Sequence, residues 1–138
     1  MQILILNGPN LNLLGQREVG IYGSESMDQY IDRLKKGYTD VSIDYFQSNI
    51  EGELINKLHE VGFSYDGIIF NPGGYSHTSV SLSDAIAAIS STVIEVHISN
   101  LYAREEYRHV SLTAKNCAGV ISGFGIKGYE IAMKTLID

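Results

Sequence analysis

The residues best suited to acid–base chemistry lie at the end of an apolar run that contains Glu95-Val96-His97. Alternate side chains of a β-strand point to the same face, so the Glu95 carboxylate can orient the His97 ring and favour its charged form. A histidine held in this way can act as a general acid near neutral pH. The residues alone leave open the simpler interpretation that His97, like His77, is a buried histidine with a structural role.

Tyr22 and Arg17, in an early polar segment, form a second candidate pair. A tyrosine with an ordinary pKa near 10 is ionised to only about one part in a thousand at pH 7. A cation within about 4–6 Å lowers such a pKa by roughly 1–3 units, so Arg17 can convert Tyr22 into a base. Their glycine-containing segment could close over a ligand. Equally, Tyr22 could only pack that segment while Arg17 pairs with Glu18.

Amide side chains accompany these groups at Asn7, Asn10, Asn12 and Asn71. Amides do not titrate at neutral pH and are poor nucleophiles, but they fix hydroxyls, carbonyls or water by hydrogen bonds. A polyhydroxylated substrate would suit them, although each can equally cap a turn beside a neighbouring glycine or proline. Gly73-Gly74 could likewise present backbone amides to an anion or form a tight turn.

Charge limits the possible partners. The chain of 138 residues has a formal net charge of −6, which argues against nucleic acid or an anionic membrane as a partner. Arg17, Arg104 and Arg108 lie in loop-like segments, so the positive charge gathers where a ligand would bind. A small anionic molecule is the ligand that this distribution favours.

Cofactor and targeting signals are missing from the sequence. Neither a glycine-rich nucleotide motif nor a metal-ligand spacing occurs, so we predict no cofactor and no metal. The single cysteine, Cys117, lies among apolar residues, which predicts a buried side chain rather than a reactive thiol. Because no apolar run approaches the length of a membrane span, we expect a cytoplasmic protein.

Short apolar runs alternate with helical periodicity along the chain. Strands are predicted at Gln2–Leu6, Val41–Phe46, Gly67–Phe70, Val93–Ile98 and Gly119–Ser122. Two helices begin with capping-box spacing, Ser26 with Gln29 and Ser48 with Glu51. The first carries apolar residues to Tyr38 and the second is stopped by Gly62; two more cover about Ser79–Ile89 and Gly128–Ile137.

This alternation predicts a single α/β domain over residues 1–138, a doubly wound five-stranded parallel sheet with helices on both faces. We choose the flavodoxin-like strand order 2-1-3-4-5. In such sheets ligands bind beyond the carboxyl ends of the strands, where the strand order reverses, here between the first and third strands. The polar segments described above all follow predicted strand ends at this edge, as a site there requires.

Three long motifs occur in order: Asn7-Gly8-Pro9-Asn10-Leu11-Asn12-Leu13-Leu14-Gly15 with Arg17 and Tyr22-Gly23; Asn71-Pro72-Gly73-Gly74-Tyr75-Ser76-His77-Thr78-Ser79; and Glu95-Val96-His97-Ile98-Ser99-Asn100 with Ala103-Arg104-Glu105-Glu106. Together they closely resemble the type II 3-dehydroquinate dehydratases. Gly123-Phe124-Gly125 and Gly128-Tyr129 match that family's last segment. The resemblance spans nearly the whole chain.

The resemblance implies a flavodoxin-like lyase that assembles as a homododecamer built from trimers and dehydrates 3-dehydroquinate to 3-dehydroshikimate by anti elimination through an enolate. It implies that Tyr22 is the base and that Arg17 keeps it ionised. A water near Asn10 would stabilise the enolate, and His97, oriented by Glu95 and helped by Asn71, would protonate the departing hydroxyl. The resemblance assigns the remaining substrate contacts to His77, Arg108, the backbone amides of Ile98 and Ser99, and Asp84 from a neighbouring subunit.

Both aromatic amino acid biosynthesis by the shikimate pathway and quinate breakdown use this dehydration. The sequence departs from the family pattern at Tyr102, where histidine is commoner, and at Gln16 and Val110, none of them catalytic positions. Two other functions stay open: a noncatalytic flavodoxin-like module that binds phosphate or flavin, and an interaction protein whose loops pack a homo-oligomer. A retained flavin would favour the first, and small-molecule binding that survives replacement of Tyr22 and His97 would favour the second.

Overall fold

The computed structural model describes residues 1–16 and 25–138 of the chain. Within these ranges the strands form one five-stranded parallel sheet of order β2-β1-β3-β4-β5, as the sequence predicts. The strands are β1 (Gln2–Asn7), β2 (Ser42–Gln47), β3 (Gly67–Asn71), β4 (Thr92–His97) and β5 (Gly119–Ser122). Each predicted strand end lies within one residue of the observed end.

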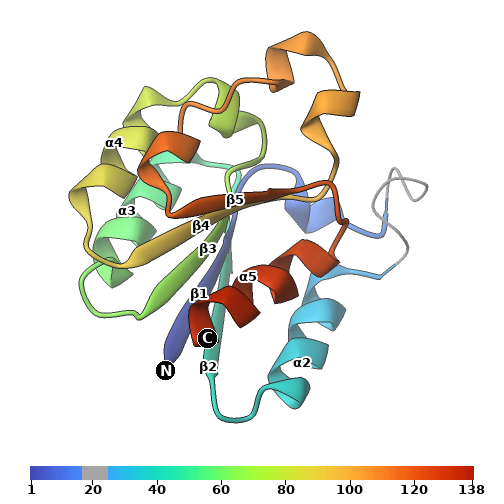
Figure 1. The fold of residues 1–138 in the computed structure, drawn as a ribbon, viewed down its shortest axis with the longest axis vertical. Helices are drawn as coiled ribbons and strands as arrows, with labels where there is room; N and C mark the ends of the chain where they lie inside the picture. Colours follow the sequence, from blue (N-terminus) through green and yellow to red (C-terminus); the bar gives the residue numbers. More distant parts are fainter. Residues whose placement is uncertain (17–24) are drawn as a thin grey trace.

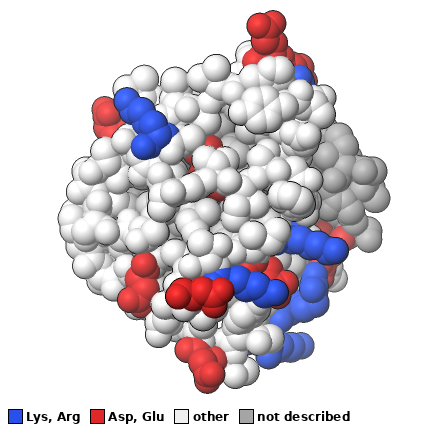
Figure 2. Space-filling view, viewed as in Figure 1, with Lys and Arg blue, Asp and Glu red and all other residues white. Residues whose placement is uncertain are grey.

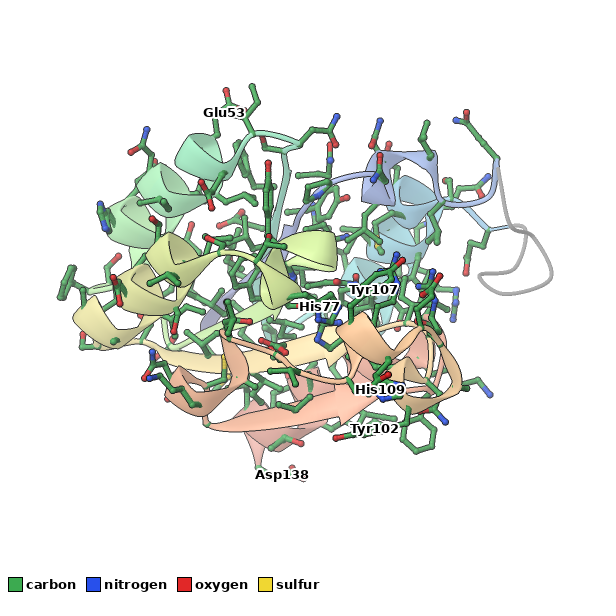
Figure 3. The ribbon with its side chains drawn as sticks, turned by 90° about the horizontal axis from the view of Figure 1, so that it is seen from above. Glu53, His77, Tyr102, Tyr107, His109 and Asp138 are labelled. Atoms are coloured by element: carbon green, nitrogen blue, oxygen red, sulfur yellow. The ribbon has the colours of Figure 1, made fainter. Side chains whose placement is uncertain are left out.

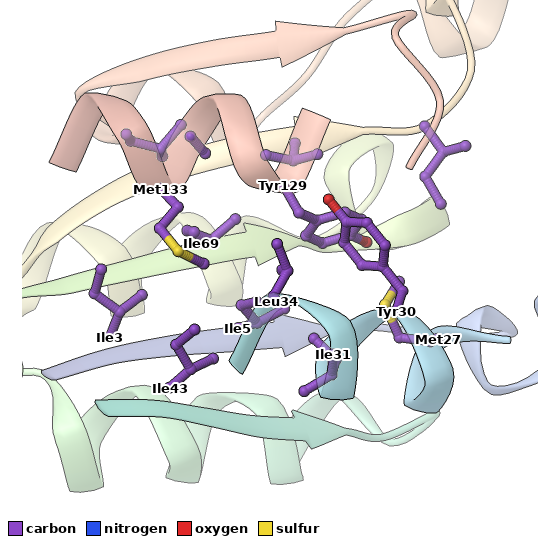
Figure 4. Close-up of a cluster of buried hydrophobic side chains, with 14 of the residues drawn as sticks. Ile3, Ile5, Met27, Tyr30, Ile31, Leu34, Ile43, Ile69, Tyr129 and Met133 are labelled. Carbon is purple, nitrogen blue, oxygen red and sulfur yellow. The ribbon is translucent and has the colours of Figure 1, made fainter. Parts of the chain in front are cut away.

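Both faces of the sheet are covered because its strands are apolar on both sides. In β1, Ile3 and Ile5 belong to one core cluster, whereas Leu4 and Leu6 belong to the other. Helices α2 (Met27–Gly37) and α5 (Lys127–Ile137) cover the first face, and α3 (Glu51–Val61) and α4 (Val80–Ala88) cover the second (Figure 1). Figure 4 shows the first cluster, in which the tyrosine rings of α2 and α5 lie close together.

The helix starts follow side-chain capping in two cases and depart from the prediction in one. Ser26 and Gln29 form the predicted capping box of α2, with hydrogen bonds of 3.1 and 3.0 Å. The Ser48–Glu51 capping box is wrong, because α3 has Ile50 at its N-cap. Ser48 therefore lies too far upstream, and its hydroxyl accepts from the Ile50 amide at 3.0 Å instead. Ser79 caps α4 by accepting from the Leu82 amide at 2.9 Å.

Short 3₁₀ turns occur in the connections that follow β1, β3 and β4. They are η1 (Leu11–Leu13) after β1, η2 (Gly73–His77) after β3, and η3 (Leu101–Ala103), η4 (Glu106–Arg108) and η5 (Ala114–Asn116) between β4 and β5. The Gly8 amide donates to the Asn71 carbonyl at 2.8 Å, which ties the first connection to the second. The turns η1 to η4 place the polar motifs around one edge of the sheet, whereas η5 precedes the amino end of β5 and packs against α4.

The surface carries charges of both signs. On the face that Figure 2 shows, large areas carry no charged side chain, and the Lys and Arg side chains toward its lower edge lie beside Asp and Glu. Across residues 1–16 and 25–138, no helix has the length and apolar character that crossing a membrane requires.

Candidate active site

A cavity of about 150 Å³ lies beyond the carboxyl ends of β1, β3 and β4, where the strand order reverses. This is the place that the sequence predicts for a site. The predicted site residues that line it are Asn10, Asn71, His77, His97, Ile98, Ser99 and Arg108. Leucines of η1 and η3 add apolar walls, so the cavity combines an apolar body with converging polar groups.

A buried histidine–carboxylate pair lies at the end of β4. His97 Nε2 donates to Glu95 Oε2 at 2.7 Å, and the two residues are 4% and 0% exposed. The shared strand face expected from their spacing therefore brings the two side chains together. Because Nε2 is engaged by Glu95, the other ring nitrogen, Nδ1, is the one left to serve the cavity that His97 lines.

The Glu95 carboxylate is held as an anion by a set of donors. Ser111 Oγ donates to Oε2 at 2.7 Å, and Thr113 Oγ1 donates to Oε1. Burial by itself raises the pKa of Glu95, but the hydrogen bond and charge of His97, with the two hydroxyls, outweigh it, and the pKa lies below its ordinary value. The pair can thus combine an ionised carboxylate with a protonated imidazole.

His77 lies beside His97 on the cavity wall. Its ring is stacked with that of His97 at a centroid separation of 6.3 Å, and its Nδ1 lies 2.7 Å from the Val110 carbonyl oxygen. A carbonyl only accepts, so Nδ1 carries hydrogen, and Nε2 can either accept or, once protonated, donate. Figure 3 shows η2, with His77, beside η4, with Tyr107.

A chain of buried hydrogen bonds fixes the amides at the ends of β1 and β3. The Tyr129 hydroxyl of α5 donates to Asn7 Oδ1 at 2.8 Å and accepts from Asn71 Nδ2 at 3.0 Å. Asn71 Oδ1 in turn accepts from the Gly73 amide at 3.0 Å. Asn7 is therefore a buried structural amide, whereas Asn71 keeps one edge on the cavity. Gly73 uses its amide to close a tight turn.

Asn10 stands at the mouth of the cavity, with an exposed side chain and a left-handed backbone of φ 71°. The backbone N–H of Asn10 donates to Asn49 Oδ1 at 3.0 Å, which fixes this unusual backbone conformation. Asn12 does not line the cavity; its side-chain oxygen accepts from Gln47 at 3.5 Å. The four amides predicted from the sequence therefore divide into two that face the cavity and two that do not.

Arginines supply positive charge to the wall formed after β4. Arg108 lines the cavity and donates through Nε to Glu105 at 2.7 Å. Arg104 also lines it, and its guanidinium donates to Ser99 Oγ at 3.3 Å. These cations suit an anionic group of a ligand beside Ile98 and Ser99.

Asp84 does not reach this cavity. It is exposed on α4 and lines a separate hollow of about 210 Å³ with Lys115.

Tyr22 and Arg17 lie outside the described residues. In the part of the chain that the structure describes, no group of three His, Cys, Asp or Glu side chains is placed to hold a metal ion. Cys117 is half-buried, and burial with the nearby Glu95 charge raises its thiol pKa to about 12.

The family model for dehydroquinase class II matches residues 1–137. The chain belongs to this family. A class II dehydroquinase from Butyrivibrio crossotus, a solved structure, has a TM-score of 0.96 and 44% identity, covering 100% of this chain and 98% of its own. The close superposition agrees with the doubly wound fold described above.

Curated relatives of this dehydroquinase family member carry the name 3-dehydroquinate dehydratase. The protein from Exiguobacterium sp. is 51% identical over 139 residues, which cover 100% of this chain and 95% of the relative. The protein from Campylobacter jejuni strain 81-176 is 50% identical over 140 residues, covering 100% and 88%. The likeness therefore extends over essentially the whole chain and not over one motif.

Sequence reasoning missed three residues that support this dehydroquinase-type site: Ser111, Thr113 and Tyr129. Ser111 and Thr113 are separated by one residue, a spacing that would place their hydroxyls on one face of a strand. They lie in a loop, where this spacing predicts nothing about their direction. Tyr129 lies on the apolar face of a predicted helix, and nothing local in the sequence shows that its hydroxyl meets two distant amides.

Proposed function

We propose that this protein dehydrates 3-dehydroquinate to 3-dehydroshikimate by an anti elimination through an enolate, without a cofactor. The observation that carries the proposal is the buried His97–Glu95 pair at a cavity that also holds His77 and Arg108. The family and the names of its full-length relatives support the same substrate.

The reaction begins with removal of a proton from the carbon beside the ketone. Tyr22 is the proposed base, and Arg17 keeps its phenol ionised by favouring the anion. The electrons of the broken C–H bond form an enolate, whose oxygen is stabilised by a water held near Asn10. The position of Asn10 at the cavity mouth supports this role.

The second half of the reaction breaks a C–O bond. The enolate collapses to an enone, the hydroxyl leaves with the bonding electrons, and His97 supplies its proton, so the products are 3-dehydroshikimate and water. Glu95 stabilises the imidazolium form that makes this donation possible. Asn71, next to His97 on the cavity wall, helps to position the departing group.

The other contacts bind the substrate's hydroxyls and carboxylate. His77 faces the hydroxyls, the backbone amides of Ile98 and Ser99 bind the carboxylate, and Arg108 adds positive charge. Asp84 does not line the active-site cavity of its own subunit, so we assign its contribution to the cavity of a neighbouring subunit. We also propose that the protein is cytoplasmic and assembles as a homododecamer built from trimers. Sedimentation of the purified protein tests this oligomeric state.

The reaction is tested by following the ultraviolet absorbance of the conjugated enone when purified protein meets 3-dehydroquinate in the presence of a chelator. Turnover should persist with chelator and collapse in Tyr22→Phe and His97→Ala while both variants stay folded. Absence of turnover in the wild-type protein would contradict the enzyme assignment and would favour the noncatalytic binding module instead.

A further inference from the structure

One loop contacts both His77 and Glu95, the carboxylate partner of His97. In the segment 109–113, the Val110 carbonyl accepts from His77, and Ser111 and Thr113 donate to Glu95. The Leu112 amide donates to the Ser76 carbonyl at 2.6 Å, which fixes the loop to η2. The loop therefore meets the acid–base pair at the Glu95 carboxylate, and neither Glu95 nor the two hydroxyl residues line the cavity.

We propose that Ser111 and Thr113 are positioning residues, whose hydroxyls keep the buried Glu95 carboxylate ionised so that the proton of the pair stays on His97. The inference rests on the proposed function, because it treats His97 as the acid. Neither hydroxyl residue lines the cavity, so their effect passes through Glu95.

The physical need for these donors follows from burial. Glu95 has no exposed surface, and an anion without donors in such a place would draw the proton away from the imidazole. Ser111 shares Oε2 with His97, and Thr113 occupies the opposite oxygen, Oε1. Both carboxylate oxygens are thus stabilised as anionic acceptors, and the proton is left on the ring that faces the cavity.

The same two hydroxyl donors influence the pH at which the His97–Glu95 pair loses its proton. Deprotonation of His97 leaves the pair with a net negative charge, which the two hydroxyls stabilise more than they stabilise the neutral ion pair. Removing a hydroxyl should therefore raise the apparent pKa of the pair and move its proton toward Glu95. The charged and titratable groups around the pair in the described chain, His77, Arg104, Arg108 and Cys117, are left unchanged.

The test compares Thr113→Val and Ser111→Ala with wild type. We expect kcat near neutral pH to fall on the order of tenfold, since a general acid contributes about 10²–10⁴-fold and these variants weaken it only in part. The KM should stay nearly constant, and the basic limb of the kcat profile should move up by about one pH unit. Proton NMR of the substrate-free protein should show His97 titrating at correspondingly higher pH.

Two controls separate positioning from general loosening of the loop. Thr113→Ser keeps the hydroxyl and should retain the wild-type profile. Ser79→Ala removes a buried hydroxyl that caps α4 without touching Glu95, so it should lower stability and leave the basic limb unmoved. If Thr113→Val fails to fold, Ser111→Ala carries the test, because Ser111 is less buried.

An unchanged His97 titration and basic limb in Thr113→Val and Ser111→Ala would overturn the inference. A wild-type protein without turnover would instead defeat the proposed function, and the NMR titration would still decide whether the hydroxyls control the proton of the pair. The two failures are therefore distinguishable.

Discussion

Removing one hydroxyl, in Tyr129→Phe, should destabilise the protein far more than the same change at Tyr30. Both phenols are essentially buried in the same core cluster, with ring centroids 6.2 Å apart. The Tyr129 hydroxyl bonds both Asn7 and Asn71, whereas the Tyr30 hydroxyl lies near the Glu130 backbone without completing a hydrogen bond. Comparing the two variants therefore separates the contribution of the hydroxyl's hydrogen bonds from that of the ring's packing.

The magnitude follows from the groups left behind. Tyr129→Phe strands a buried amide oxygen on Asn7 and a buried amide hydrogen on Asn71, and each unsatisfied group costs about 1–3 kcal/mol. Relaxation of Asn71 toward the cavity recovers part of this, so we expect a loss of about 2–4 kcal/mol in the free energy of unfolding. Tyr30→Phe should change it by less than about 1 kcal/mol and can even stabilise.

Urea denaturation at one fixed protein concentration measures both values, since an assembling protein gains apparent stability with concentration. Enzyme assays of the same variants should show a weakened site only in Tyr129→Phe, because Asn71 lines the cavity. Equal losses of stability in the two variants would refute the argument, since the ring and not the hydroxyl would then be the stabilising part.

Three further predictions concern other residues. The pKa of Glu95 lies below its ordinary 4.5 in the folded state, so its stabilising effect is present above that pH and is lost as pH falls through the folded value. Acid unfolding of wild type should therefore lose stability below about pH 4.5 more steeply than Glu95→Gln, and parallel curves would contradict this. Cys117 should react with a thiol reagent at pH 8 much more slowly in native protein than in urea, because its pKa is raised to about 12; equal rates would show an accessible thiolate. Gly8→Ala places a Cβ 2.4 Å from the Pro72 carbonyl oxygen and should cost about 1–3 kcal/mol, whereas Gly52→Ala meets nothing within 4 Å and should be neutral or slightly stabilising in thermal melts; similar behaviour of the two would contradict the close approach.

The sheet could be predicted because its signals are local. Alternating and continuous apolar runs mark the strands, and the helices between them force parallel neighbours, from which the edge that holds the site follows. Glu95 and His97 could be paired from the period of a strand alone. Their contact at 2.7 Å confirms that reasoning.

The loops were harder, since 3₁₀ turns of a few residues have no periodicity to detect. The sequence pattern at Ser48 predicts the wrong helix start because a serine that closes a turn and a serine that caps a helix have the same local appearance. The alternatives for Asn7 and Asn71 could not be separated either, because the choice depends on Tyr129, which the chain supplies from its final helix.

The hydrogen bond between Asn7 and Tyr129 joins residues 122 positions apart. A ribosome that adds roughly 5–20 residues per second needs on the order of ten seconds between these two residues. During that interval the strand that ends at Asn7 can pair with its neighbours, but its amide has no phenol to meet. We therefore expect Asn7 and Asn71 to reach their final arrangement only when α5 docks, and a nascent chain to acquire secondary structure before it acquires the full capacity to bind a ligand.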